Sequence, residues 1–423
     1  MKNDIIKLEN YIENICLKAN KASKILFSAS TTSKNKALKL ISANINKDTN
    51  KILKANKKDM HLAKNKNTSS ALLDRLYLDK KRIKDIIKGL DNIIKLDDPV
   101  GKIIKNWTPK NGIKMCQTRV PIGVIGIIYE SRPNVAVDAS SLSLKSGNAI
   151  ILRGGSESFY SSTAITNSIR NGLKESSLPI NSVQMIKTTD RRAVSKLLKM
   201  NSLINLIIPR GGKSLIEKIQ KDSKIPVLSH LDGLCHTYID NKANKNMSID
   251  IALNAKMRRT GICGATETLL CHKETSKNIL PDIIDILLKN GCEIRGDKKV
   301  QTLNNRVKPA DELDWHTEYL DSIISIKIVN DMHDAIHHIE KYGSNHTDAI
   351  ITENKRNAEI FLKHVNSAIV IHNASTQYAD GGEFGMGGEM GIATGKLHAR
   401  GPVALEELTT YKYQLRGKGQ IRP

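Results

Sequence analysis

The sequence predicts an α/β protein with two doubly wound domains, each containing a parallel sheet covered by helices. A chain of 423 residues is too long for one ordinary core. Short apolar runs alternate with amphipathic stretches after residue 120, and the same alternation starts again near residue 235. Apolar runs that lack polar alternation are typical of parallel strands buried on both faces.

The composition is that of a globular chain whose charge is spread over its length. Hydrophobic residues make up 39% and the formal net charge is +23. Lysines occur in helices and loops alike, without a single basic tract or interleaved aromatic residues, so we expect no nucleic-acid partner. No apolar run reaches the roughly 18 residues of a membrane span. With Asp4, Glu9 and Glu13 arguing against a transit peptide, we expect a cytoplasmic protein without membrane contact.

The six cysteines are widely spaced and show neither a C-x-x-C pair nor zinc-finger spacing. The spacing therefore predicts no metal site. In a cytoplasmic chain we expect these cysteines to be reduced and mostly buried.

The first 120 residues are predicted to form a helical layer followed by a hairpin. Residues 1–98 carry apolar residues at helical spacing, with lysines on the other faces, which indicates a layer packed on a sheet. Within Lys102–Val120, the turn signal at Pro109–Gly112 separates two short extended runs. Two interpretations stay open, namely an arm that pairs with a partner subunit and an ordinary surface hairpin.

The stretch 121–228 is predicted to be the first α/β domain. Ligands of such sheets bind at the carboxyl ends of strands, which directs attention to Tyr129–Asn134, Arg153–Ser156 and Arg210–Ser214. No strict G-x-G-x-x-G opens a helix, and Ile207 stands where a phosphate loop needs its first glycine. The expected strands are Ile122–Tyr129, Ala149–Arg153, Ser182–Lys187, Leu203–Ile208 and Ile225–Leu228, and the expected helices are Val135–Ser146, Ser156–Glu175 with Ser156 as N-cap, Asp190–Met200 and Lys213–Lys221.

A second α/β domain is expected to carry Cys263. This cysteine lies between Gly261 and Gly264, downstream of Lys256, Arg258 and Arg259. Nearby cations favour a reactive thiolate, and flanking glycines allow close approach of a substrate. The alternative is a buried small hydrophobe, as most free cysteines are. The expected strands are Thr237–Asp240, Thr268–His272, Glu293–Arg295, Ile323–Val329 and Ala349–Thr352, and the expected helices are Ile249–Met257, Ile279–Lys289 and Asp334–Tyr342.

The C-terminal part begins with a helix at Ala358–Val365 and a strand at Ala368–Ile371, which we expect to return to the first domain. A glycine-rich stretch, Asp380–Gly391, is either a loop closely approached by a ligand or a linker. Tyr411–Leu415 is a candidate final strand.

Several segments resemble the γ-glutamyl phosphate reductase family, a branch of the aldehyde dehydrogenase superfamily. The resemblance extends roughly from residue 20 to 415. It is carried by Pro121–Gly126, Glu130–Val135, the Cys263 loop, Gly391-Ile392 and Lys396–Pro402.

The resemblance implies an aldehyde-dehydrogenase-like fold with a small β oligomerisation arm. It also implies NADPH-dependent reduction of L-glutamyl 5-phosphate to L-glutamate 5-semialdehyde, the second step of proline biosynthesis, in a homo-oligomer (dimer or tetramer). A glutamate 5-kinase is the partner that it suggests. The implied boundaries are 1–102, 121–229 and 353–394 for the NADPH-binding domain, 230–352 for the catalytic domain, and 103–120 and 395–423 for the arm.

The resemblance also implies roles for individual residues. Cys263 would form a thioester and Asn134 would stabilise the oxyanion, although a plain turn residue is an alternative for Asn134. No Glu occurs between Glu217 and Glu267, where hydrolytic relatives carry the base that activates water. Thr260 departs from the proline expected before the cysteine. The remaining candidates are Arg153, Gly154, Gly155, Ser156, Arg210, Gly211, Gly212 and Glu318 for the cofactor, and Arg132, Arg259, His398 and Arg400 for the substrate.

Three other functions stay open. A hydrolytic or CoA-acylating aldehyde dehydrogenase would share the cysteine but not the dependence on phosphate. A basic nucleic-acid-binding protein would show salt-dependent binding to DNA that does not need Cys263. The third is a degenerate, inactive relative.

Overall fold

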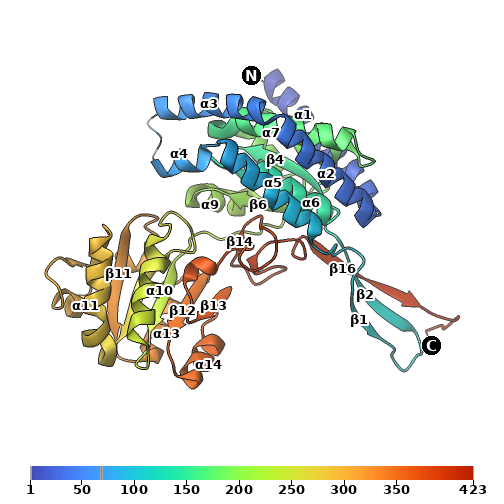
Figure 1. Ribbon diagram of the computed structural model, residues 1–423. Helices are drawn as coiled ribbons and strands as arrows, with labels where there is room; N and C mark the ends of the chain where they lie inside the picture. Colours follow the sequence, from blue (N-terminus) through green and yellow to red (C-terminus); the bar gives the residue numbers. More distant parts are fainter. Residues whose placement is uncertain (1, 67, 69, 423) are drawn as a thin grey trace. The chain divides into compact units, whose positions relative to one another are not determined.

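The computed structural model describes residues 2–66, 68 and 70–422 and divides them into two compact units. Unit 1 lies within Met1–Ser229, Gly385–Gly391 and Val403–Pro423, and unit 2 comprises His230–Phe384 and Ile392–Pro402. Each unit contains a parallel sheet with helices packed on it (Figure 1), so the predicted α/β class is confirmed. Among the described residues, no helix combines the length and the apolar character that a membrane crossing requires.

Unit 1 is a parallel sheet beneath a thick helical layer. Its helices are α1 (Lys2–Leu26), α2 (Thr31–Lys47), α3 (Thr49–Asn65), α4 (Ser70–Leu76), α5 (Lys80–Lys95), α6 (Val135–Lys145), α7 (Phe159–Lys174), α8 (Arg192–Leu197) and α9 (Lys213–Asp222). Its strands are β1 (Ile103–Trp107), β2 (Lys114–Pro121), β3 (Val124–Tyr129), β4 (Ala149–Gly154), β5 (Val183–Met185), β6 (Leu206–Arg210) and β16 (Thr409–Arg416).

The helical layer follows from the spacing of apolar residues near the N-terminus. In α2, Leu38, Ile41 and Ile45 are fully buried, while most of the lysines face solvent. Lys34 is the exception, because its ammonium is buried and forms an ion pair of 2.5 Å with Asp98. The prediction of a helical layer with lysine-rich outer faces is therefore confirmed.

The sheet of unit 1 has the strand order β5-β4-β3-β6, and its strands run parallel. The predicted strand at Ile225–Leu228 is wrong, because only an isolated bridge joins Val227 to Ile207. Pro226 has no N–H to donate to a ladder, which limits pairing at this edge.

The predicted N-cap at Ser156 is also wrong. The N–H groups of Tyr160 and Ser161, in the first turn of α7, donate to the carboxylate of Asp59, which comes from α3. Ser156 instead begins a short 3-10 turn, η1 (Ser156–Ser158), and its hydroxyl donates to Glu157.

The predicted hairpin is present and is joined by the C-terminal strand. β1 and β16 flank β2 in an antiparallel sheet of three strands, which projects from the helices of unit 1 (Figure 1). The turn is closed by the N–H of Gly112, which donates to the Pro109 carbonyl, and Gly112 has φ +75°.

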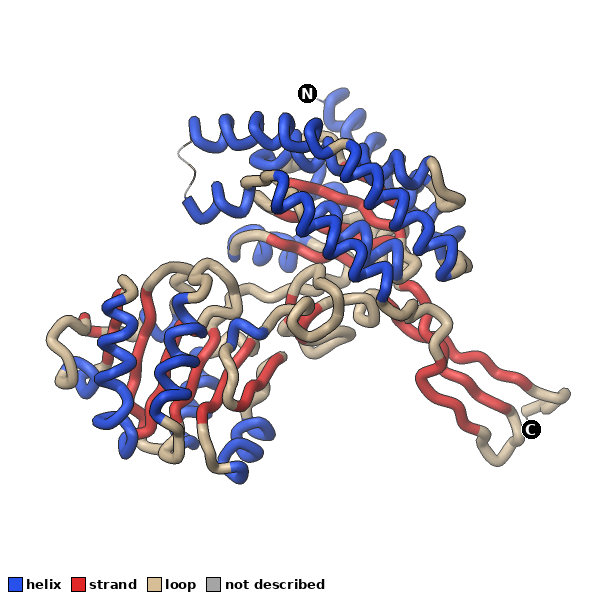
Figure 2. Tube along the Cα trace, in the orientation of Figure 1, coloured by secondary structure: helices blue, strands red, loops and turns tan. Residues whose placement is uncertain are grey.

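Unit 2 contains a larger parallel sheet whose two faces are covered by helices (Figure 2). Its helices are α10 (Lys245–Met257), α11 (Lys273–Lys289), α12 (Lys298–Gln301), α13 (Met332–Tyr342) and α14 (Lys355–His364). Its strands are β7 (Cys235–Ile239), β8 (Thr266–His272), β9 (Glu293–Gly296), β10 (Lys308–Pro309), β11 (Ile323–Val329), β12 (Thr347–Ile351), β13 (Ile369–His372), β14 (Ile392–Ala393) and β15 (Gly401–Pro402).

The seven strands of the main sheet in unit 2 run in the order β10-β9-β11-β8-β7-β12-β13, with parallel pairing throughout. One core contains Ile279 and Ile283 of α11, and another contains Ile336 of α13 and Phe361 of α14. Burial on both faces explains why these strands appear as apolar runs in the sequence.

The segment after β12 differs from the expectation. Residues 353–394 are predicted to belong to the first domain, but β13 pairs with β12, and residues up to Phe384 lie in unit 2. Apolar runs alone do not show which sheet a terminal strand joins, and here a short βαβ connection through α14 keeps it beside its predecessor.

The packing of α7 on α2 generates a test with two glycines. A Cβ on Gly172 of α7 would lie 2.6 Å from the backbone nitrogen of Ile41 in α2, whereas a Cβ on Gly89 of α5 would meet nothing within 4 Å. We expect Gly172→Ala to lower the free energy of unfolding by about 1–3 kcal/mol through overpacking. Gly89→Ala should instead raise it by up to about 1 kcal/mol, since alanine is the better helix former.

Urea denaturation of both variants beside the parent protein measures the two changes. A stabilising effect of Gly172→Ala equal to that of Gly89→Ala would contradict the close contact of α2 and α7.

Candidate active site

Cys263 lies in the turn between α10 and β8, just before the amino end of a central strand. Its side chain is half-buried, while the other five cysteines are buried. The turn therefore presents this sulfur differently from the rest.

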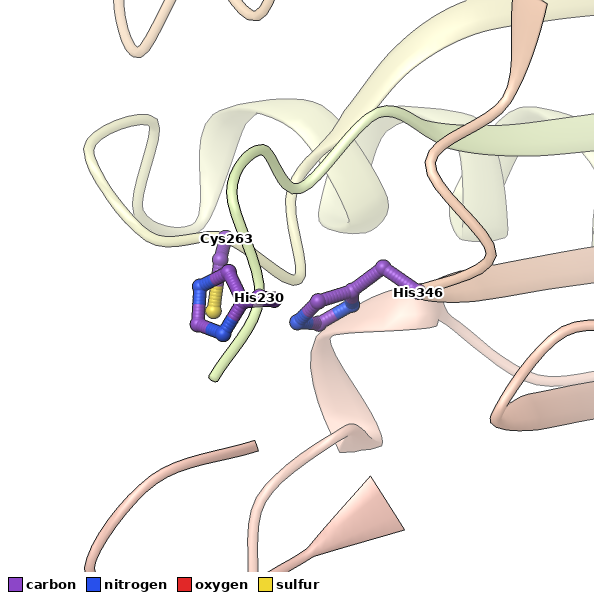
Figure 3. Close-up of side chains that lie close together, drawn as sticks. All are labelled: His230, Cys263 and His346. Atoms are coloured by element: carbon purple, nitrogen blue, oxygen red, sulfur yellow. The ribbon is translucent and has the colours of Figure 1, made fainter. Parts of the chain in front are cut away.

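Two histidines lie before the next two strands of the sheet, β7 beside β8 and β12 beside β7. His230 precedes β7, and His346 directly precedes β12. Because β8, β7 and β12 are parallel neighbours, their amino ends meet at one edge of the sheet. The ligand atoms of His230, Cys263 and His346 lie within 4.8 Å of one another, and the three side chains point toward a common centre (Figure 3).

Each imidazole is held through its other ring nitrogen. His230 Nδ1 lies 2.8 Å from the carbonyl oxygen of Ile392, and His346 Nδ1 lies 2.9 Å from the hydroxyl of Thr347. The two rings meet edge to face, with centroids 5.0 Å apart. His346 is completely buried. These contacts leave Nε2 of each ring as the atom available to the sulfur.

The backbone of the cysteine turn packs against the segment that leads into β7. A Cβ on Gly233 would lie 2.6 Å from Cα of Cys263, so this close approach requires glycine. The Cys235 thiol donates to the Cys263 carbonyl over 3.0 Å. The position of the nucleophile candidate is thus set by the adjacent segment as well as by its own loop.

The imidazoles control the charge of the sulfur. Burial alone would raise the pKa of Cys263, but the charge of His346 and the contacts with His230 and His346 outweigh it and hold the pKa well below the usual value. Burial raises the pKa of Cys16, Cys271 and Cys292 to about 12. Cys263 is therefore the cysteine whose surroundings favour the thiolate.

Glu318 is a further group near the sulfur. Its carboxylate accepts the backbone N–H of Gly233, and its pKa is raised by burial and by the neighbouring Cys263. A buried ion pair supports this region, because Lys256 donates to Glu267 over 2.6 Å and the N–H of Leu320 donates to the same carboxylate. Leu320 has φ +52°, a strained conformation for a non-glycine residue. Glu267 thus helps to fix the turn that presents Glu318.

The cofactor candidates of unit 1 gather at the carboxyl edge of its sheet. The N–H of Gly155 donates to the Tyr129 carbonyl, and the N–H of Glu130 donates to the Arg210 carbonyl. These bonds bring the loops after β3, β4 and β6 together. The predicted cofactor contacts at this edge are Arg153, Gly154, Gly155, Ser156, Arg210, Gly211 and Gly212.

Arg153 turns inward at this edge. Its guanidinium donates to the carbonyls of Gly154 and Thr189, and its Nε has no hydrogen-bond partner within the described part of the chain. Arg191, which the sequence analysis did not single out, is exposed and lies near enough to act on the charge of Arg153.

Asn134 is also in unit 1, at the start of α6, where it makes no side-chain cap. Its Nδ2 donates to Asp138 over 3.0 Å, and desolvation raises the pKa of Asp138 to about 6. One of the two amide hydrogens is therefore engaged, which fixes the direction of the group. Arg132, two residues before it, is half-buried.

The other substrate candidates are spread over unit 2. Arg259 is exposed, and its carbonyl accepts a hydrogen bond from Gln377. His398 is exposed at φ +67°. Arg400 donates to the side chain and the carbonyl of Asn366. None of these contacts joins the arginines to the cluster of Cys263, His230 and His346.

The two histidines are the residues that the sequence analysis missed. His346 directly precedes β12 and His230 lies in the segment that leads into β7, so a search at the amino ends of strands would have pointed to them. Such a search needs to know that β8, β7 and β12 are consecutive strands of one sheet. This order is a property of the folded sheet, and no local sequence pattern shows it.

Comparison with known proteins gives consistent matches over nearly the whole chain. The family model described as the aldehyde dehydrogenase family matches residues 10–291. A "Gamma-glutamyl phosphate reductase" of Paramagnetospirillum magneticum is 51% identical over 98% of this chain and 98% of its own length. A protein of the same name from Rhodospirillum rubrum is 52% identical over 96% of this chain and 95% of its own length. The crystal structure of gamma-glutamyl phosphate reductase from Thermotoga maritima superimposes with a TM-score of 0.94 at 44% identity, covering 97% of this chain and all of that one.

The exposure and charge of Cys263 predict selective alkylation. In the folded protein, iodoacetamide should modify one of the six thiols first, on the peptide that contains Cys263, because the others are buried. His346→Asn should slow this reaction at neutral pH several-fold, since it removes the largest contribution that favours the thiolate. Peptide mapping by mass spectrometry after timed alkylation measures both effects.

His333→Asn is the matched control, because His333 is an exposed histidine of α13 in the same unit. Alkylation at an unchanged rate in folded His346→Asn would show that this imidazole does not activate the sulfur.

Proposed function

The chain belongs to the aldehyde dehydrogenase family, in its γ-glutamyl phosphate reductase branch, and we propose that it reduces L-glutamyl 5-phosphate to L-glutamate 5-semialdehyde and phosphate with NADPH. The observation that carries this proposal is the half-buried sulfur of Cys263 between two imidazoles. The names and the full-length coverage of the relatives support the substrate.

Covalent catalysis begins at Cys263. The thiolate attacks the acyl-phosphate carbonyl, a C–S bond forms, and the C–O bond to phosphate breaks, so that phosphate leaves with the electron pair and a thioester remains. The imidazoles of His230 and His346 keep the sulfur anionic for this attack. The same surroundings favour departure of the thiolate when the hemithioacetal later collapses to the aldehyde.

An oxyanion forms on the carbonyl oxygen in both tetrahedral species. We assign its stabilisation to the amide of Asn134 and the backbone N–H of Cys263, as the family resemblance implies. The bond from Asn134 to Asp138 restricts the rotation of the amide and leaves its second hydrogen for the oxyanion. A donor of this kind typically contributes about a hundred- to a thousandfold in rate.

The aldehyde dehydrogenase fold implies a nicotinamide cofactor, and the carboxyl edge of the sheet in unit 1 suits one. The N–H of Gly212, which caps α9, already binds a carboxylate oxygen of Glu130 at 3.0 Å, so this helix start accepts anionic oxygen. When bound, NADPH supplies the hydride that reduces the thioester. Gly154, Gly155, Ser156, Arg210, Gly211 and Gly212 are the proposed contacts at this edge, and Glu318 is the proposed contact of the ribose next to nicotinamide.

Arginine near the end of β4 supports NADPH over NADH. Arg153 is buried and already donates to backbone carbonyls. We therefore assign the direct contact with the 2′-phosphate to the exposed Arg191. The role of Arg153 is to add positive charge near that contact. For the substrate, Arg132, Arg259, His398 and Arg400 stay the proposed contacts of phosphate and α-carboxylate.

The three-stranded arm suits a contact with a second copy of the chain. Both of its outer strands, β1 and β16, are edge strands, and Ile103, Tyr413 and Leu415 are more than half exposed on them. We therefore propose a homo-oligomer assembled through the arm. The enzyme would act in the cytoplasm, where a glutamate 5-kinase would supply the labile acyl phosphate.

The reaction is tested in reverse with purified protein. Pyrroline-5-carboxylate and NADP should give NADPH absorbance only when phosphate is added, and Cys263→Ala should lower the rate by several orders of magnitude. NADPH formation without phosphate would indicate hydrolysis of the thioester instead, and undiminished activity of Cys263→Ala would exclude the covalent route.

The same assay tests the cofactor assignment. Arg191→Ala should raise the KM for NADP about tenfold or more and leave the KM for NAD unchanged, because it removes a cation that pairs with the 2′-phosphate. Arg192→Ala is the matched control, since Arg192 instead pairs with Asp190. Equal effects of the two substitutions would contradict the role of Arg191.

Light scattering tests the arm. Leu415→Asp places a charge on the exposed edge strand β16 and should shift the protein to a monomer, while Lys412→Asp, on the same strand, serves as a charge-changing control. A parent protein that is already monomeric would refute the oligomer proposal.

A further inference from the structure

The cluster of Cys263, His230 and His346 has the donor set of a metal site as well as that of a nucleophile. One thiolate sulfur and two imidazole nitrogens are ligands that Zn²⁺ prefers. We propose that these three residues bind one Zn²⁺ per chain and that the bound ion reversibly blocks Cys263. Metal binding itself does not depend on the proposed function, and only the loss of reductase activity rests on it.

The distances are close to what zinc requires. With Zn–S of about 2.3 Å and Zn–N of about 2.0 Å, neighbouring ligand atoms in a tetrahedral site lie about 3.3–3.6 Å apart. In this chain the three ligand atoms already lie within 4.8 Å of one another without an ion. Side-chain movements of about 1 Å therefore complete the geometry, and they need no change of the strands that carry the residues.

The surroundings of the histidines are those of metal ligands. A ligating histidine usually engages its second ring nitrogen with a carbonyl or another fixed group, which sets the tautomer and the orientation of the ring. His230 Nδ1 contacts the Ile392 carbonyl, and His346 Nδ1 contacts the Thr347 hydroxyl. His346 Nε2 is buried and, apart from its contact with the Cys263 sulfur, has no hydrogen-bond partner among the described residues. A buried nitrogen of this kind is costly unless it finds a partner, and an ion at the centre of the cluster would provide one.

The site would be accessible and incomplete, which suits a reversible inhibitor. His230 and Cys263 are half-buried, so an ion can enter from solvent. Three protein ligands leave a fourth position for water. In the described ranges, this is the single group of three or more such side chains with ligand spacing, so binding of one ion per chain is expected.

The consequence for the nucleophile is direct. A sulfur bonded to zinc has its reactive electron pair engaged by the ion and cannot attack a carbonyl carbon. Removing the ion with a chelator restores the free thiolate, because no covalent bond of the protein has changed. The ion would also shield the sulfur from alkylating reagents.

Cobalt titration tests the site without relying on catalysis. The full-length protein, stripped with a chelator, is titrated with Co²⁺, whose bond to a thiolate gives a charge-transfer absorption band. We expect the band to saturate at one equivalent and to disappear when Zn²⁺ is added. Cys263→Ser should abolish the band, and His346→Asn should weaken binding by at least about tenfold.

Two further variants keep the test decisive. His230→Asn alters a half-buried ligand, and it replaces His346→Asn in the test if the buried His346 proves necessary for folding. His333 is an exposed histidine outside the cluster, so His333→Asn should bind Co²⁺ like the parent protein. Absence of a thiolate–cobalt band in the parent, or a cobalt affinity of folded His230→Asn and His346→Asn equal to that of the parent, would overturn the proposal.

Activity is measured separately. Stoichiometric Zn²⁺ should abolish the phosphate-dependent reverse reaction, and chelator should restore it. If the band appears as expected but the metal-free protein lacks this activity, the metal site stands and the proposed function fails. If the enzyme is active and stoichiometric Zn²⁺ leaves it so, the blocking role of the ion is refuted.

Discussion

The chemistry proposed for this chain depends on the electrostatic contact between the sulfur of Cys263 and the imidazoles of His230 and His346. The contact overcomes the penalty of burying a charged sulfur, so the pKa of this thiol falls while that of other buried cysteines rises. It exists because β8, β7 and β12 are parallel neighbours whose amino ends meet at one edge. The order of the strands in unit 2 therefore decides the chemistry of a residue in a turn.

A second layer of contacts holds this arrangement in place. Gly233 allows the segment before β7 to touch the backbone of the cysteine turn, and its N–H fixes Glu318 beside the sulfur. Behind them, Lys256 and Glu267 form an ion pair that solvent does not reach. Burial raises the pKa of Glu267 to about 7 in spite of that partner. A buried ion pair is weak evidence for stability. Here its role is to hold the Glu267 carboxylate, which accepts the N–H of Leu320 and so orients the turn that carries Glu318.

The sequence predicted the α/β class and most of the apolar strands, because burial on both faces leaves a clear pattern. It also singled out Cys263 from its glycines and cations. It did not predict His230 and His346, since neighbours at a sheet edge depend on strand order, which no local pattern records. The same limit explains why β13 was assigned to the wrong domain. Asp59 caps α7 in place of Ser156, because its carboxylate, about a hundred residues earlier in the chain, accepts the N–H groups of Tyr160 and Ser161.

The central claim is that Cys263 carries the acyl group, and a trapping experiment without reductant tests it most directly. The protein is mixed with L-glutamyl 5-phosphate in the absence of NADPH, and phosphate release and intact mass are followed together. Above the spontaneous release from the labile acyl phosphate, the account predicts a burst of one phosphate and one glutamyl group gained per chain, on the peptide that contains Cys263, with neither in Cys263→Ala. An adduct on a different side chain, or equal phosphate release by Cys263→Ala, would contradict it.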